Sequence, residues 1–347
     1  MTVAQKFETP SALAQSPSLL RVRDLETRFF TRRRGVVHAV NGVTFNLRKG
    51  ERLAVVGESG SGKSVMTMSL MRLIGHPGRI VGGQVSLDGT DVLGLGEKAL
   101  NDLRGRRIAM VFQDPMTSLN AVLRVGDQVM APMIRHLRLS RVEARTRAIE
   151  LLAQVGIPAP ELRVDAYPHE LSGGMRQRVL IAMALSCKPE VILADEPTTA
   201  LDVTIQAQII TLLRKLAEET GVAVILVTHD LGLVARFAQT VAVMYAGRIV
   251  EMGPVREIYR NPQHPYTQGL LSSIPTTVGP RVDRLSQIPG SPPDMSQIPP
   301  GCAFAPRCPM VARPCTQEAP PLLRRGPSHT AACWVTSSQP VSGGDDE

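Results

Sequence analysis

The sequence has few aromatic residues and no long uncharged apolar run. Phe, Trp and Tyr make up 3% of the 347 residues, whereas apolar residues make up 43%. The core must therefore consist mainly of Val, Leu, Ile, Ala and Met. Apolar runs such as 179–187 are much shorter than the ~20 residues that a membrane-spanning helix needs, and the first residues lack the apolar stretch of a signal peptide. We expect an intracellular protein that does not cross a membrane by itself.

Positive charge is present but not concentrated. Lys and Arg number 39 and Asp and Glu number 31, which gives a formal net charge of +8. The basic residues are spread along the chain, and aromatic residues are not interleaved with them. The sequence therefore lacks the stacking platform that is typical of single-strand binding, and we expect no nucleic-acid partner.

A buried strand, a glycine-rich loop and a helix follow one another near residue 60. Residues 53–56 are all apolar, as in a strand that is buried on both faces, and a helical pattern begins at Lys63. The loop has the form G-x-x-x-x-G-K-S and consists of Gly57, Glu58, Ser59, Gly60, Ser61, Gly62, Lys63 and Ser64. In this motif backbone N–H groups surround a phosphate, the lysine contacts the β- and γ-phosphates and the hydroxyl binds Mg²⁺. We predict a nucleotide site here, with Ser64 as a magnesium ligand.

Two carboxylates follow a second buried strand, residues 191–193. Asp195 and Glu196 stand where such a strand ends. Alone, an acidic pair at a strand end is often simply solvated, but here it lies downstream of a phosphate-binding loop. We predict that Asp195 is a magnesium ligand and that Glu196 is the general base that orients the attacking water.

The segment Leu171–Gln177 begins another helix. Ser172 is a favourable N-cap, and Gly173 and Gly174 expose backbone donors, so this helix start is a second device for binding an anion. One nucleotide has little need of two such devices. An ordinary helix start would have the same residues, and both interpretations stay open on these residues alone.

The remaining pattern predicts an α/β fold with a largely parallel sheet, because apolar strands alternate with helices. Residues from about 115 to 180 are expected to be helical, and 43–47 alternates as a half-buried strand does. After about residue 255 prolines interrupt the chain repeatedly. We expect a flexible tail over 1–17, an ATPase domain over 18–255, a loop-rich extension over 256–336 and a disordered tail over 337–347.

Six segments together resemble the ATP-binding-cassette (ABC) family and occur in its order. They are the Walker A loop 57–64, Gln113, the signature 171–174, the Walker B pair 195–196, the D-loop 200–202 and His229. The resemblance implies a P-loop NTPase core of ABC type with an inserted helical subdomain and an antiparallel β subdomain. It also implies that two such domains pair head to tail, so that Walker A of one and the signature of the other enclose each ATP.

The same resemblance implies roles for individual residues. His229 would hold the γ-phosphate and Glu196 in register, and Gln113 would reach the Mg²⁺ and couple it to membrane-spanning subunits. The family stacks adenine on an aromatic residue near the end of its first strand, for which we expect Phe29, with Phe30 as the alternative. The remaining expected nucleotide contacts are Ser172, Gly173, Gly174, Gln177 and Asp202.

Other segments resemble the dipeptide/oligopeptide branch of importer ATPases: 112–120, 167–170, 195–204, 261–267 and 301–309. This implies an ATP-hydrolysing subunit that couples hydrolysis to uptake of dipeptides or oligopeptides and lies at the cytoplasmic face of the cell membrane. Its partners would be a sister ATPase or a second copy, two transmembrane permease subunits and, indirectly, an extracytoplasmic solute-binding protein. The alternatives are an importer of a non-peptide solute such as nickel or an opine, or an ABC ATPase that acts on the ribosome or DNA.

Four of the five cysteines lie in the extension: Cys302, Cys308, Cys315 and Cys333. Their spacing is not the C-x₂-C pairing of zinc ribbons, and four such thiols could hold a [4Fe–4S] cluster or zinc, or remain free. Resemblance to the peptide-importer branch favours the [4Fe–4S] cluster. Cys187 is expected in the core and His329 at the surface.

Overall fold

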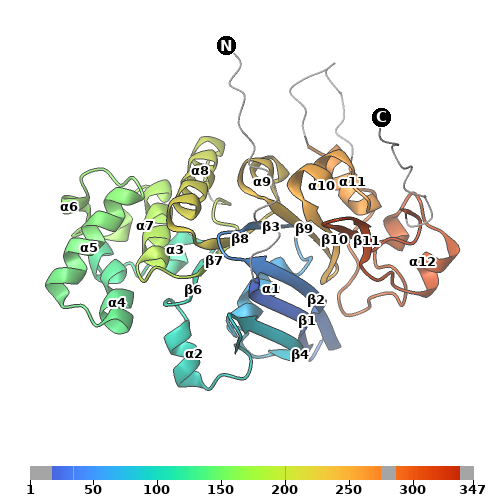
Figure 1. The fold of residues 1–347 in the computed structure, drawn as a ribbon, viewed down its shortest axis with the longest axis horizontal. Helices are drawn as coiled ribbons and strands as arrows, with labels where there is room; N and C mark the ends of the chain where they lie inside the picture. The colour runs from blue at the N-terminus through green and yellow to red at the C-terminus, as the bar shows by residue number, and fades with distance from the viewer. Residues whose placement is uncertain (1–17, 34, 200, 275–286, 337–347) are drawn as a thin grey trace, which may run out of the picture.

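The fold was obtained as a computed structural model, which describes residues 18–33, 35–199, 201–274 and 287–336. The expected tails, 1–17 and 337–347, lie outside the described residues. Figure 1 shows a helical lobe, a central sheet, a second sheet beneath it and a C-terminal part beside it. No helix in the described ranges is both long and apolar enough to cross a membrane.

The central sheet runs in the order β11-β12-β10-β9-β3-β8-β7-β6, and its parallel part extends from β9 to β6. The expected parallel arrangement is therefore present. The five parallel strands are almost wholly buried because helices or the second sheet cover both faces. Their bounds are β3 (Arg52–Val56), β6 (Ile108–Val111), β7 (Val191–Asp195), β8 (Ala223–Thr228) and β9 (Thr240–Tyr245).

A separate antiparallel sheet has the order β2-β1-β4-β5. In β2 the side chains of Val43, Phe45 and Leu47 are buried while the residues between them are exposed, as the alternating pattern predicted. The bounds are β1 (Ser18–Thr31), β2 (Gly35–Arg48), β4 (Gly78–Leu87) and β5 (Thr90–Asp91).

Two apolar clusters fill the two faces of the central sheet, and consecutive residues of β3 point into different ones. Leu53 and Val55 belong to the cluster shared with the antiparallel sheet and with α1 (Lys63–Leu70) and α2 (Glu97–Leu103). Ala54 and Val56 belong to the cluster shared with α8 (Val203–Thr220) and α9 (Leu231–Phe237). This alternation fixes β3 between two layers.

The segment from 115 to 185 is helical, as predicted, and forms the green lobe at the left of Figure 1. Its second long helix begins with a capping box, in which Ser140 and Glu143 satisfy each other's backbone N–H groups. The elements are α3 (Pro115–Ser118), α4 (Val125–Leu137), α5 (Arg141–Gln154), α6 (Pro160–Arg163), η2 (Pro168–Glu170) and α7 (Gly173–Leu185).

The C-terminal part is continuous with the rest of the fold, which the sequence did not indicate. Strand β12 pairs antiparallel with β10, so the extension lengthens the central sheet. Tyr266 and Phe304 belong to the same apolar cluster as β8 and β9, so no break in the core coincides with residue 255. The elements are β10 (Arg248–Pro254), α10 (Val255–Arg260), α11 (Pro265–Ser272), η3 (Ala305–Arg307), α12 (Arg313–Gln317), β11 (Leu323–Gly326) and β12 (His329–Ala331).

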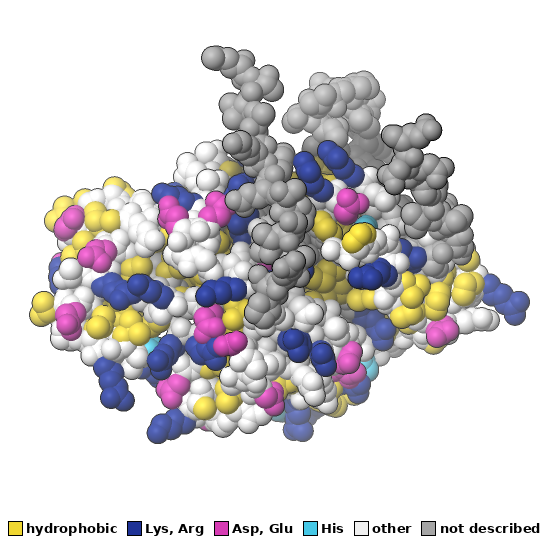
Figure 2. Space-filling view, viewed as in Figure 1, with side chains coloured by type: hydrophobic (Ala, Val, Ile, Leu, Met, Phe, Trp, Pro, Cys, Tyr) yellow, Lys and Arg dark blue, Asp and Glu magenta, His cyan; other side chains and the backbone are white. Residues whose placement is uncertain are grey.

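Figure 2 shows Lys and Arg side chains spread over one face among Asp and Glu side chains. This agrees with the dispersed charge of the sequence. Cys187 is buried, as expected.

The expectation for His329 is wrong: its side chain is buried and its Nε2 lies 2.7 Å from Oε1 of Glu251. Glu251 is fully buried and also accepts hydrogen bonds from the backbone N–H groups of Gln263 and His264, at 2.6 and 2.8 Å. A buried carboxylate must have such partners. This carboxylate joins β10, β12 and the start of α11.

We predict that Glu251→Ala lowers the free energy of unfolding by about 3–5 kcal/mol, because it leaves His329 and two backbone donors buried without an acceptor. Chemical denaturation of the full chain measures this loss. Glu257→Ala, an exposed position in α10, is the matched control and should change stability by less than about 0.5 kcal/mol. Equal effects of the two substitutions would contradict the assignment.

Candidate nucleotide site

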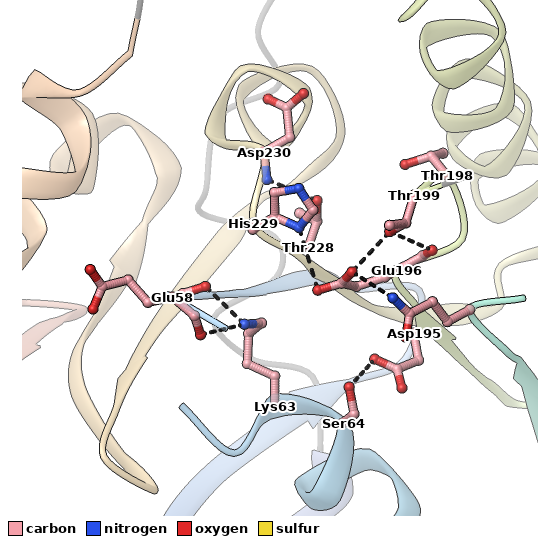
Figure 3. A network of polar contacts seen from close by, with 12 residues as sticks. Glu58, Lys63, Ser64, Asp195, Glu196, Thr198, Thr199, Thr228, His229 and Asp230 are labelled. Carbon is pink, nitrogen blue, oxygen red and sulfur yellow. Dashed lines mark hydrogen bonds and ion pairs between the residues drawn. The ribbon is translucent and has the colours of Figure 1, made fainter. Parts of the chain in front are cut away.

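The parallel sheet brings the predicted phosphate-handling residues to one edge. Val56 of β3 pairs with Thr228 of β8, and Asp195 of β7 pairs with Val227 of β8. The three strands therefore end side by side, so that the loop after β3, the carboxylates at the end of β7 and His229 after β8 meet. Figure 3 shows this group.

Lys63 is the first residue of α1, and its side chain reaches back to the loop that precedes this helix. Its Nζ donates to the backbone oxygens of Gly57 at 2.8 Å and Glu58 at 2.9 Å. The side chain is buried, and burial lowers the pKa of its ammonium, while nearby Glu196 and Asp195 act in the opposite direction. A cation with little access to water at a helix start is suited to an anion.

Two glycines make this loop possible. Gly57 has φ +153° and Gly62 has φ +100°, and a Cβ on either would lie 2.2 Å from a backbone oxygen, of Met244 and Ala39 respectively. No other residue could occupy these positions without moving β9 or β2. The loop is thus held against both sheets through backbone contact.

Ser64 and Asp195 place two side-chain oxygen atoms next to each other. The Ser64 hydroxyl donates to Oδ1 of Asp195 at 2.9 Å. Burial raises the pKa of the Asp195 carboxyl, and the Ser64 hydrogen bond partly offsets this. A hydroxyl and a poorly solvated carboxylate are the hard ligands that Mg²⁺ prefers.

Glu196 is held by three side chains from three segments. Gln113 donates to Oε2 at 3.1 Å, Thr199 donates to Oε2 at 2.8 Å, and Nδ1 of His229 lies 3.4 Å from Oε1. Its φ of +44° is unusual for a residue with a side chain and costs about 1–3 kcal/mol. The strained backbone and the three contacts fix one orientation of the carboxylate.

The contact of Thr199 with Glu196 was not predicted from the sequence. Thr199 lies within segment 195–204, which resembles the peptide-importer branch, but nothing in that pattern indicated a contact with Glu196. A hydroxyl three residues after a carboxylate, in the loop that follows a buried strand, was the available signal.

The signature residues lie at the N-terminal end of α7, away from this network. The Ser172 side chain caps the helix by accepting a hydrogen bond from the N–H of Met175 at 3.3 Å. In the described residues, no hydrogen bond joins Ser172, Gly173 or Gly174 to the loop 57–64. Figure 1 shows α7 in the helical lobe and α1 at the centre of the molecule.

The start of α7 packs on the D-loop and α8. A Cβ on Gly174 would lie 2.9 Å from Ile205, and one on Gly173 would lie 3.3 Å from Leu201. Asp202 caps α8 by accepting from the N–H of Ile205 at 3.0 Å. The first residue of the D-loop, Ala200, lies outside the described residues.

Gln177 is buried in the structure of the single chain. It is 1% exposed, and neither its amide oxygen nor its amide nitrogen has a hydrogen-bond partner among the described residues. Gln177 lies on the side of α7 that packs against the rest of the protein. A contact between Gln177 and a nucleotide held by another subunit stays a prediction.

The expected aromatic residues lie at the end of β1. The Phe29 ring lies 2.7 Å from the position of a Cβ on Gly78, so it packs on β4, while Phe30 is 47% exposed and stacks with Arg79. A cavity of about 260 Å³ lies beside the loop, lined by Val37, residues 58–61 and 245–246, and residues 292–295 of the extension. Neither phenylalanine lines it.

The four extension cysteines converge. Cys302, Cys308, Cys315 and Cys333 all line one small cavity of about 10 Å³ together with apolar residues such as Phe304. None of the four forms a disulfide. In the described part of the chain, no three His, Cys, Asp or Glu side chains are close enough together to hold a single metal ion.

Comparisons with known proteins identify two regions. A family profile described as "ABC transporter" matches residues 40–199, and one described as "Oligopeptide/dipeptide transporter, C-terminal region" matches residues 250–315. The oligopeptide transport ATP-binding protein OppD of Bacillus subtilis is 50% identical over 91% of this chain and 88% of its own length. A putative peptide import ATP-binding protein of Brucella melitensis is 51% identical over 91% of this chain and 96% of its own.

Solved structures show the same fold. The dimeric ATP-binding cassette MJ0796, in a post-hydrolysis state bound to ADP and Pi, matches with a TM-score of 0.61 and 33% identity over 68% of this chain and 99% of that one. The cbiO1 cassette of Clostridium perfringens matches with a TM-score of 0.60 and 30% identity over 70% and 91%. The fold is therefore the mixed α/β fold of ABC ATPases with its antiparallel β sheet.

We predict that Gly62→Ala destabilises the nucleotide-free protein more than Gly60→Ala. Both positions have positive φ, which costs roughly 1–2 kcal/mol for alanine, but a Cβ on Gly60 meets nothing within 4 Å whereas one on Gly62 meets the Ala39 oxygen at 2.2 Å. Urea denaturation of the two variants measures the difference. Equal losses would show that the close contact with β2 is not maintained in solution.

Proposed function

The chain belongs to the ATP-binding proteins of the oligopeptide/dipeptide ABC transporter family, and from this membership we propose that it is the ATP-hydrolysing subunit of a peptide importer. The observation that carries the proposal is the network at the sheet edge, where Lys63, Ser64, Asp195 and Glu196 meet. The C-terminal profile supports peptides as the solute, with a non-peptide solute such as nickel or an opine as the alternative.

The nucleotide would be held by the loop 57–64. Lys63 is suited to the β- and γ-phosphates because it is a buried cation inside the loop. Ser64 and Asp195, with Gln113 close by, are suited to Mg²⁺, which neutralises charge on the phosphates when bound. Phe29 remains our prediction for adenine stacking; the cavity lined by Val37 lies beside the strand that pairs with Phe29.

Glu196 is the general base in this proposal. A carboxylate fixed by Gln113, Thr199 and His229 loses little freedom when it orients a water molecule, which favours an in-line attack. His229, 59% exposed in its side chain, can reach a γ-phosphate from this position. Thr199 positions the carboxylate on the side opposite to His229.

The signature would act on the ATP of a second subunit. Ser172, Gly173 and Gly174 present a helix start on a surface remote from the chain's own loop, and Asp202 lies next to them, which supports head-to-tail pairing. MJ0796 is dimeric in its solved structures. We propose a sister ATPase as the partner, with a second copy of this chain as the other possibility.

The surface around α3 and α4 is the proposed contact with two transmembrane permease subunits. Met116, Val122 and Leu123 expose 63%, 78% and 45% of their surface there, beside Gln113, and such exposed apolar side chains favour a partner. The subunit would thus lie at the cytoplasmic face of the membrane and would serve an extracytoplasmic solute-binding protein indirectly. Residues 115–180 would form the helical subdomain of an ATPase domain over 18–255, followed by the cysteine-bearing extension over 256–336.

We expect Glu196→Gln to abolish ATP hydrolysis while leaving ATP binding intact, because the amide keeps the shape of the side chain but cannot accept the proton of water. Steady-state phosphate release and nucleotide titration measure the two properties, ideally with the transmembrane subunits present. Glu161→Gln, at an exposed site in α6, should leave both unchanged. Retained turnover in Glu196→Gln would remove Glu196 as the base.

The four converging cysteines are proposed to hold a [4Fe–4S] cluster. Four thiolates are the donor set that such a cluster requires, and four cysteines from separate segments line one cavity together with His264 and apolar residues. In a [4Fe–4S] cluster each thiolate binds a different iron, so the four sulfurs need not all reach one ion, and among the described residues no three such side chains do. A cluster here would tie together a part of the chain whose regular elements are short.

Anaerobically purified protein should contain iron and acid-labile sulfide in a ratio near one to one, and a broad absorption near 400 nm would accompany them. Metal and sulfide analysis checks this directly. The variant Cys187→Ser, which alters the buried cysteine outside the extension, should retain both, whereas Cys308→Ser should lose them. Zinc without sulfide in the wild-type protein would overturn the cluster proposal.

A further inference from the structure

Two side chains of the extension reach the phosphate-binding loop at Glu58. The Arg307 guanidinium donates to both carboxylate oxygens of Glu58, at 2.7 and 2.9 Å. The Tyr266 hydroxyl accepts a hydrogen bond from the backbone N–H of Glu58 at 2.8 Å. One residue of the loop is thus held through both its side chain and its backbone.

Arg307 has little freedom to leave this position. Its side chain is 5% exposed, its Nε donates to the Pro289 oxygen at 2.8 Å, and its guanidinium lies against the rings of Tyr245 and Phe304. The hydrogen bonds to Glu58 raise the pKa of Arg307 further above its usual range. A bidentate pair between a buried guanidinium and a carboxylate is both strong and directional.

The contact continues from Glu58 to the phosphate lysine. Figure 3 shows the Glu58 carboxylate pointing away from Lys63, while the backbone oxygen of Glu58 accepts a hydrogen bond from Lys63 Nζ at 2.9 Å. Any displacement of the Glu58 backbone would therefore move an acceptor of Lys63. The outer side of the loop is fixed by the extension, and the inner side would face the phosphates.

We propose that Arg307 and Tyr266 are positioning residues of the nucleotide site, which set the affinity for ATP by fixing the loop at Glu58. This inference rests on the proposed ATPase function. Arg307 lies in the turn between Cys302 and Cys308, and that turn is closed by hydrogen bonds from Cys302 to Cys315 and from Arg307 to Phe304. The fold of the four-cysteine unit and the affinity for ATP are consequently coupled, and the coupling must act in both directions.

The test measures binding of a fluorescent ATP analogue with Mg²⁺ to the purified full chain. We expect Arg307→Met to weaken the affinity roughly 10- to 100-fold, since a small displacement of a binding loop has effects of this size. Tyr266→Phe should weaken it less, and Arg307→Lys should fall between wild type and Arg307→Met. Arg313→Met, an exposed arginine of the same unit, is the matched control and should not change the affinity.

A double-mutant cycle with Glu58→Gln separates the pair from a general loss of stability. The affinity of the double variant Glu58→Gln/Arg307→Met for ATP should be no lower than that of the single variant with the lower affinity. The reason is that both substitutions remove the same contact. Hydrogen exchange gives the reciprocal readout: the ATP analogue should slow exchange over 302–308 in the wild type and much less in Arg307→Met, with 141–154 as the internal reference.

Unchanged affinity in Arg307→Met, even with a lower melting temperature, would overturn the inference and leave Arg307 a structural residue. Additive losses in the cycle would do the same. If Arg307→Met does not fold, Arg307→Lys and Tyr266→Phe decide the question in the same assay, and wild-type affinity in both would overturn it. Absence of ATP binding by the wild type would instead refute the proposed function.

Discussion

The parallel pairing of β3, β8 and β7 is the constraint on which the candidate site depends. Because these strands run in one direction, their carboxyl ends meet, and each delivers one component: the phosphate loop, His229 and the carboxylates. The register matters as much as the direction. A shift of β7 by one residue would turn Asp195 to the other face of the sheet and separate it from Ser64.

The same arrangement reduces the stability of the protein when no nucleotide is bound. Lys63 and Asp195 both lose solvent, and burial shifts their pKa values in opposite directions, each toward the uncharged form. Glu196 adds a strained backbone. Nucleotide and cation would relieve the first two effects, because they bring opposite charges to both groups. Local instability of this kind is common where a protein must bind charged ligands.

The features that could be predicted from the sequence are those that depend on residues close together in the chain. The glycine loop, the buried strands and the carboxylates at the end of β7 are recognisable because each depends on neighbours in the chain. Contacts between distant segments were not predictable: Arg307 and Glu58 are 249 residues apart, and the burial of His329 depends on the pairing of β12 with β10. The burial of Gln177 was not predictable either, because a helix start gives no sign of which side of the later helix is packed.

The two strands of the extension also determine which surfaces a shortened chain would expose. A chain ending at residue 255 would leave β10 as an open edge with unpaired N–H and C=O groups where β12 now lies, and it would expose the ring of Tyr245, which now packs on Tyr266 and Phe304. Open edges beside apolar surface favour pairing between molecules. Such a fragment, although it would retain every ATPase motif, would tend to aggregate rather than behave as a minimal enzyme.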